Sequence, residues 1–114
     1  MIEKELKFEN KENIEQQLIR LLKERGAEDS EAKECLDNWT REQEKQVELS
    51  DDYHLEQIQF NLRRARLYFK AEYIDEAFEN FEDARIQARN EQRDELYQAI
   101  MKEIDELEDS MEKQ

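Results

Sequence analysis

The near-absence of helix-breaking residues constrains this chain most. Proline is missing from the 114 residues, and glycine occurs once, at Gly26. These two residues cost the most inside a helix, so a chain that avoids them favours long helices joined by short turns. The sequence therefore predicts an all-α fold, a bundle or array of four to five helices, in a single domain over residues 1–114.

The acidic charge limits the kinds of partner. Charged residues make up 44 % of the chain and the formal net charge is −14. General nucleic-acid binders and binders of anionic membranes gain affinity through Lys and Arg, so we expect neither activity; a basic partner would be attracted instead. No apolar stretch is long enough for a signal or membrane segment, and Cys35 stands alone. We expect a cytoplasmic protein.

Two amphipathic stripes predict the N-terminal half. Gly26 lies where the first stripe ends, as is typical of a helix stop, and Asp29 follows as a cap for the second helix. Together the two helices form a pair over residues 10–50. The sequence leaves residues 1–9 open between a frayed helical turn and a flexible arm that docks Phe8.

The C-terminal half, residues 52–107, predicts a helical hairpin followed by a capping helix. Its first helix, capped within residues 50–52, is apolar on several sides, which is typical of a helix wedged between neighbours. A turn over residues 70–73 leads to a helix that Asp75 can cap. The apolar pattern shifts phase around Asn90, which predicts that a fifth helix is separate from the fourth or kinked against it.

The hairpin resembles a tetratricopeptide repeat over about residues 58–107. That family's pattern places Trp, Leu and a small residue, Tyr, Ala, Phe and Pro at fixed spacings. In this chain those positions hold Asn61, Arg64, Ala65, Tyr68, Ala77, Phe81 and Arg89. The small residue, the Tyr, the Ala and the Phe match. The Trp, the Leu and the Pro do not, and Glu72 stands where Gly is usual.

An internal echo supports the same interpretation. Leu96 and Ala99 follow Leu62 and Ala65 at the family's repeat length of about 34 residues. The fifth helix would then begin an incomplete second repeat and act as a polar cap. A generic helical bundle is the alternative. Because so few repeats bury little surface, the N-terminal helices or a second copy of the chain must cover the hairpin, and a homo-oligomer is one expectation.

A cationic ridge on the hairpin is the candidate binding site. Arg63, Arg66 and Lys70 are spaced i, i+3, i+7, and the resemblance implies that this side of the helix lines a concave groove shared with Arg93. Arg pairs bidentately with carboxylates, and an aromatic ring would give an apolar floor. The predicted partner-binding residues are Arg63, Arg66, Phe69, Lys70, Arg93 and Tyr97. The alternative is that these cations neutralise acids on adjacent helices.

No set of residues predicts catalysis. His54 lies near Asp51, Asp52 and Glu56, but a single His at a polar helix start is usually a surface residue rather than a metal ligand. Cys35 falls in an apolar stripe, where a thiol behaves as a small buried residue. Acidic pairs are too frequent to be informative, because 32 acids on helical surfaces produce them by chance. We predict no catalytic residue, no cofactor and no metal.

The sequence thus predicts a non-enzymatic protein–protein interaction module, a tetratricopeptide-like adaptor or scaffold that binds a partner peptide or protein. The alternative is an acidic nucleic-acid mimic, or an inhibitor or antitoxin-type protein that binds a basic partner. Salt separates the two, because the affinity of a charge mimic falls steeply with ionic strength.

Overall fold

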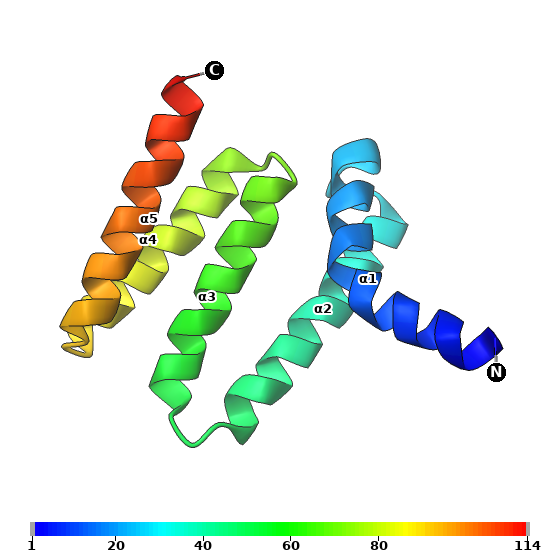
Figure 1. Ribbon diagram of the computed structural model, residues 1–114, viewed down its shortest axis with the longest axis horizontal. Coiled ribbons are helices and arrows are strands. Elements are labelled where there is room, and N and C mark those ends of the chain that lie inside the picture. The colour runs from blue at the N-terminus through cyan, green and yellow to red at the C-terminus, as the bar shows by residue number, and fades with distance from the viewer. Residues whose placement is uncertain (1, 114) are drawn as a thin grey trace.

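The structure, a computed structural model, describes the backbone of residues 2–113 and the side chains of residues 14–113. Over that range the chain forms five α-helices and no strand, which confirms the all-α fold (Figure 1). The helices are α1 (Ile2–Arg25), α2 (Ser30–Leu49), α3 (Tyr53–Lys70), α4 (Ile74–Asn90) and α5 (Asp94–Glu112). Within the described residues, none of these helices is long and apolar enough to cross a membrane.

The junction between the two N-terminal helices is the one that the sequence predicts, but the first helix begins at Ile2 and not at residue 10. Gly26 ends α1 with a φ of 89°, in the left-handed region that glycine adopts without strain, and its N–H donates to the carbonyl of Leu22. Asp29 caps α2 by accepting from the backbone N–H of Ala32 at 3.1 Å. The helix α1 begins at Ile2, so residues 2–9 continue it, and the docking of Phe8 lies outside the described side chains.

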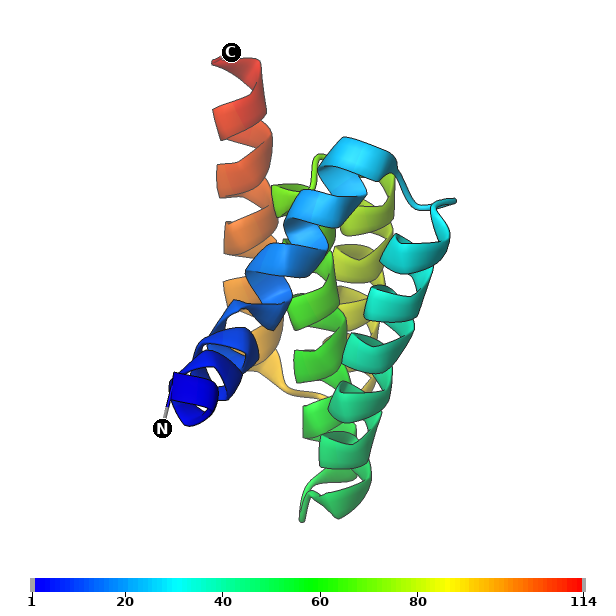
Figure 2. The same ribbon diagram turned by 90° about the vertical axis from the view of Figure 1, so that its right-hand side faces the viewer.

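The helix α3 lies in the middle of the array, between α1 and α2 on one side and α4 and α5 on the other (Figure 1). Turned by 90°, the view shows α2 and α4 toward one side of α3 and α5 toward the other (Figure 2). On one face of α3, Phe60 and Leu67 pack in an apolar cluster with Trp39 of α2 and residues of α1. On the other face, Leu62 and its neighbours pack in a second cluster with α4 and α5. The prediction of a wedged helix is confirmed.

The N-terminal helices therefore cover the hairpin within one chain. Besides the apolar cluster, the hydroxyl of Tyr73, at the start of α4, donates to the carbonyl of Leu22 near the end of α1 at 3.1 Å. This bond joins a residue that precedes α3 in the chain to one that follows it. Packing of α3 does not need a second copy of the chain, and self-association stays a prediction.

The two C-terminal turns have nearly the same geometry. Glu72, between α3 and α4, has a φ of 70°, and Gln92, between α4 and α5, has a φ of 57°. In each turn the residue that follows donates its N–H back to a carbonyl five residues earlier, from Tyr73 to Tyr68 and from Arg93 to Ala88. The backbone of the turn, and not Asp75, starts α4: Tyr73 is its N-cap and makes no side-chain capping bond. The expectation that Asp75 caps this helix is wrong, because the turn places the helix start two residues earlier.

Candidate functional site

Arg66 forms the most regular polar contact on the predicted site. Its Nε and Nη2 each donate to one carboxylate oxygen of Glu103 on α5, both at 2.8 Å. This bond is the main reason why the pKa of Arg66 is raised above its ordinary value. Both side chains remain partly exposed, at 44 % and 30 %. The fork joins α3 to α5 across the array, and it shows that Arg66 is presented in a geometry that receives a carboxylate.

Arg93 makes a second ion pair between the same two helices, at their other end. Its Nη2 donates to both carboxylate oxygens of Asp52, at 2.9 and 3.0 Å. Asp52 is the N-cap of α3 and also accepts from the backbone N–H of Leu55 at 3.1 Å. The pKa of Asp52 is lowered, first by the Leu55 N–H and then by Arg93. Arg93, the N-cap of α5, therefore holds the N-cap of α3 in place.

Arg63 turns toward a different neighbour. Its Nε donates to Gln43 of α2 at 2.5 Å, and its Nη2 lies 3.8 Å from a carboxylate oxygen of Glu56. Arg63 and Arg66 are thus three residues apart in α3 but contact α2 and α5 respectively. The structure does not bring the predicted arginines together as one set of free cations, since each already has a partner within the chain.

The other three predicted residues are less engaged. Lys70, the last residue of α3, is exposed and forms no ion pair within residues 14–113. Phe69 is half-buried and meets the ring of Phe78 edge-on, with centroids 6.2 Å apart. Tyr97 accepts a hydrogen bond from Arg85 at 3.3 Å. A partner's carboxylate can reach Lys70 directly, but at Arg66 it must displace Glu103.

Sequence reasoning missed a buried polar network inside the α3–α4 hairpin. Arg64 Nε donates to the side-chain oxygen of Asn80 at 2.6 Å, and Arg64 Nη2 donates to that of Asn61 at 3.1 Å. Asn61 donates in turn to Gln87 at 2.7 Å, and the Arg64 guanidinium lies 4.7 Å from the ring centroid of Phe60. Asn61 and Arg64 occupy the positions where the tetratricopeptide pattern, which the sequence only resembles, has Trp and Leu. That mismatch was the signal that could have located the network.

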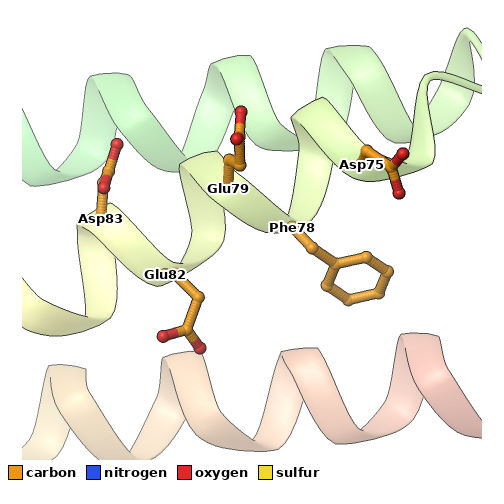
Figure 3. A pocket seen from close by; sticks show the side chains of 5 residues that line it. All are labelled: Asp75, Phe78, Glu79, Glu82 and Asp83. Carbon is orange, nitrogen blue, oxygen red and sulfur yellow. The ribbon is translucent and has the colours of Figure 1, made fainter.

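A hollow on the outward face of α4 was also missed. It has a volume of about 680 Å³ and is lined by Asp75, Phe78, Glu79, Glu82 and Asp83 (Figure 3). Phe78 and Glu82 point toward α5, whereas Glu79 and Asp83 point toward the opposite edge of α4. The hollow therefore combines one aromatic ring with four carboxylates, and no cation is among its described lining residues. Treating all acidic pairs as chance hid this arrangement.

The two residues considered for chemistry lie apart from these features. His54 borders a small hollow of about 150 Å³ whose other lining residues are polar, and it meets Tyr53 edge-on. Cys35 borders a hollow of about 270 Å³ between α1 and α2. Burial is the main reason why the pKa of its thiol is raised, and Glu31 adds to the effect. Among the described residues, no group of three potential metal ligands comes together.

The chain was compared with protein-family models, with curated proteins and with solved structures, and none of the three comparisons finds a match.

Proposed function

We propose that this protein is a non-enzymatic protein–protein interaction module, a tetratricopeptide-like adaptor that acts in the cytoplasm. Its partner is a peptide or protein that places carboxylates against the surface shared by α3 and α5. The fork from Arg66 to Glu103 carries this proposal, because Glu103 occupies Arg66 in the way that a partner's carboxylate would. Lys70, one helical turn further along α3, is exposed beside it.

The repeated turn geometry supports the helical-repeat part of the proposal. The turns at residues 71–73 and 91–93 share the same order of backbone conformations, with a left-handed residue in the middle of each. Glu72 takes that left-handed conformation at the position where the family usually has Gly. Arrays of similar helical units commonly bind partners along an extended surface.

The test removes the Glu103 carboxylate, which competes with a partner for Arg66, and the Arg66 guanidinium itself in two separate variants. Glu103→Gln frees Arg66, whereas Arg66→Gln removes the guanidinium. Each variant is immobilised and used to capture proteins from an extract of the native host, which are then identified by mass spectrometry. We expect recovery of a specific partner to rise roughly threefold with Glu103→Gln and to fall by a similar factor with Arg66→Gln, as exposed ion pairs of modest strength allow.

A matched control breaks an exposed ion pair elsewhere. Glu82→Gln removes the carboxylate that Arg85 binds at 2.7 Å within α4, and we expect it to leave recovery through the α3–α5 surface unchanged. Circular dichroism checks that all three variants keep their helical content. Equal recovery from every variant, with unchanged helical spectra, would rule out the α3–α5 surface as the binding site.

A second candidate function is inhibition of a basic protein by charge mimicry. The observation that favours it is the absence of any ion pair at Asp75, Glu79 and Asp83 within residues 14–113, in a chain of net charge −14. A captured partner that is released by moderate salt supports the mimic, because such binding depends on many charges at once. A partner retained in that salt supports the adaptor.

A further inference from the structure

The outward face of α4 carries an unneutralised row of acids. Asp75, Glu79 and Asp83 are spaced i, i+4, i+8, so they lie on one side of the helix, and all three are exposed. Like charges at this spacing destabilise a helix, although Asp75 in the first turn also favours the helix dipole. None of the three forms an ion pair with another residue between 14 and 113.

Two arginines elsewhere in the chain bind the chain's own carboxylates. Arg66 binds Glu103 on α5, and Arg93 binds Asp52 at the start of α3. Among the acids of the hollow, Glu82 alone has a cationic partner within the described part of the chain: Arg85, which also donates to Tyr97. The row on α4 is therefore a run of three neighbouring carboxylates without a cationic partner among the described residues.

An aromatic ring forms the apolar part of the same hollow. Phe78 is partly exposed, and two rings hold it in place: Phe69 meets it edge-on at 6.2 Å, and the fully buried Phe81 lies 6.2 Å away in a tilted arrangement. Such packing restricts the ring, so little conformational freedom is lost when a ligand covers it. A rigid aromatic side chain in a hollow that acids also line can receive an aliphatic side chain or the stem and charge of Lys or Arg.

We infer that the hollow on α4 is a docking surface for a cationic, amphipathic α-helix of a partner protein. On α4, acids at i, i+4 and i+8 are about 6 Å apart along the axis and span about 12 Å. Lys or Arg at the same spacing on an adjacent helix meets all three acids, and an apolar residue on the side of that row toward α5 covers Phe78. Nucleic acid and a second copy of this acidic chain carry the same sign of charge as this surface, so neither is complementary to it. The inference shares with the proposed function the premise of an interaction module, but it does not depend on the α3–α5 surface.

Two synthetic peptides of about 13 residues, each about 20 Å long as a helix, test the inference. They have identical composition. In the patterned peptide, Lys recurs every fourth residue on one face beside a central Leu; in the shuffled peptide, the Lys residues are spread around the helix. Each is titrated into isotope-labelled protein, and backbone amide shifts are followed by NMR. We expect the patterned peptide to bind several-fold more tightly, with the largest shifts in residues 75–83.

Isosteric variants separate local recognition from net charge. The α4 triple variant combines Asp75→Asn, Glu79→Gln and Asp83→Asn. The control removes the same charge from exposed α5 acids that form no ion pair in the described chain, through Asp105→Asn, Glu106→Gln and Asp109→Asn. We expect the α4 triple variant to weaken binding of the patterned peptide about tenfold and the control to weaken it less than about twofold.

Each other outcome overturns the inference. Equal weakening by both triple variants would mean that only net charge matters. Largest shifts outside residues 75–83, equal affinity for both peptides, or no binding at millimolar concentration would each reject the α4 hollow as a site for such a helix. Arg66→Gln leaves peptide binding to α4 unchanged if the inference holds. The same variant lowers host-partner capture if the α3–α5 proposal holds, so the two can fail separately.

Discussion

Replacing Asn80 with alanine removes two hydrogen bonds from inside the α3–α4 hairpin. The side-chain oxygen of Asn80 accepts from Arg64 Nε at 2.6 Å, and its amide nitrogen donates to the carbonyl of Glu76 at 2.7 Å. Asn80 is only 8 % exposed, so water cannot readily replace these partners. The first bond involves a charged group and contributes about 1.5–3 kcal/mol; the second contributes about 0.5–1.5 kcal/mol.

Part of that loss is compensated. Arg64 keeps its bond to Asn61 at 3.1 Å and its contact with the ring of Phe60 at 4.7 Å. We therefore expect Asn80→Ala to lower the free energy of unfolding by about 2 kcal/mol, near the lower end of the combined range. For a chain of this length, that loss corresponds to a fall in melting temperature of about 8 °C.

Urea unfolding followed by far-UV circular dichroism measures the change. Glu103→Gln is the control, because it breaks an exposed pair whose contribution is about 0–1 kcal/mol. A double-mutant cycle with Arg64→Met and Asn80→Leu isolates the contact, and we expect a coupling energy of about 1–2 kcal/mol. A loss below about 0.5 kcal/mol for Asn80→Ala, or a coupling energy near zero, would refute the view that this network stabilises the hairpin.

Three further predictions concern single residues. Glu72→Gly should raise the melting temperature, because residue 72 has a φ of 70° and only glycine adopts that region freely. The ion pair that is lost, between Glu72 and Lys23, is long at 3.9 Å and exposed, so its loss costs little. A lower melting temperature would contradict the view that Glu72 is strained. In an NMR titration the pKa of Asp52 should lie below its ordinary value, and Arg93→Gln should raise that pKa only in part, because the Leu55 N–H is the larger cause. Because the pKa of Asp52 is lower in the folded state, its stabilising effect is present above the unfolded pKa of about 4 and is lost as pH falls through the folded pKa. An ordinary pKa for Asp52 in the unmodified protein would contradict the predicted effect of Leu55 and Arg93. Near neutral pH, Cys35 should react with a thiol reagent more slowly in the folded protein than in the chain unfolded by urea, because burial raises the pKa of the thiol. Equal reaction rates would show that the thiol is not shielded.

The sequence predicted the helices well because helix formation leaves a local signal. The apolar stripes, the glycine at position 26 and the cap at Asp29 depend on neighbours a few residues away, and the structure confirms each of them. The cap at Asp75 failed because the left-handed Glu72 determines where α4 starts, and a glutamate gives no local sign of that conformation.

The partners of the candidate site were harder to predict, because they depend on distances between helices. Arg66 could have paired with any of many acids, and only the placement of α5 selects Glu103. Arg63 and Arg66 shared one ridge in the sequence, but residues three apart are separated by about 60° around the helix axis, which is enough to direct them to different neighbours. Asn61 and Arg64 were visible as departures from the family's pattern, yet their bonds to Gln87 and Asn80 required the hairpin to be closed.

The position of α3 between two apolar clusters has a consequence for the order of assembly. Contacts between α3 and α4 are close in sequence, so this hairpin is the unit that can form early at low entropic cost. Its two sides then offer separate templates, one for α1 and α2 and one for α5. Between residues 14 and 113 the outer elements share no apolar cluster with each other, so we expect that each can detach while the hairpin persists. A partner that orders α4 would strengthen α3 and, through it, the attachment of the N-terminal pair.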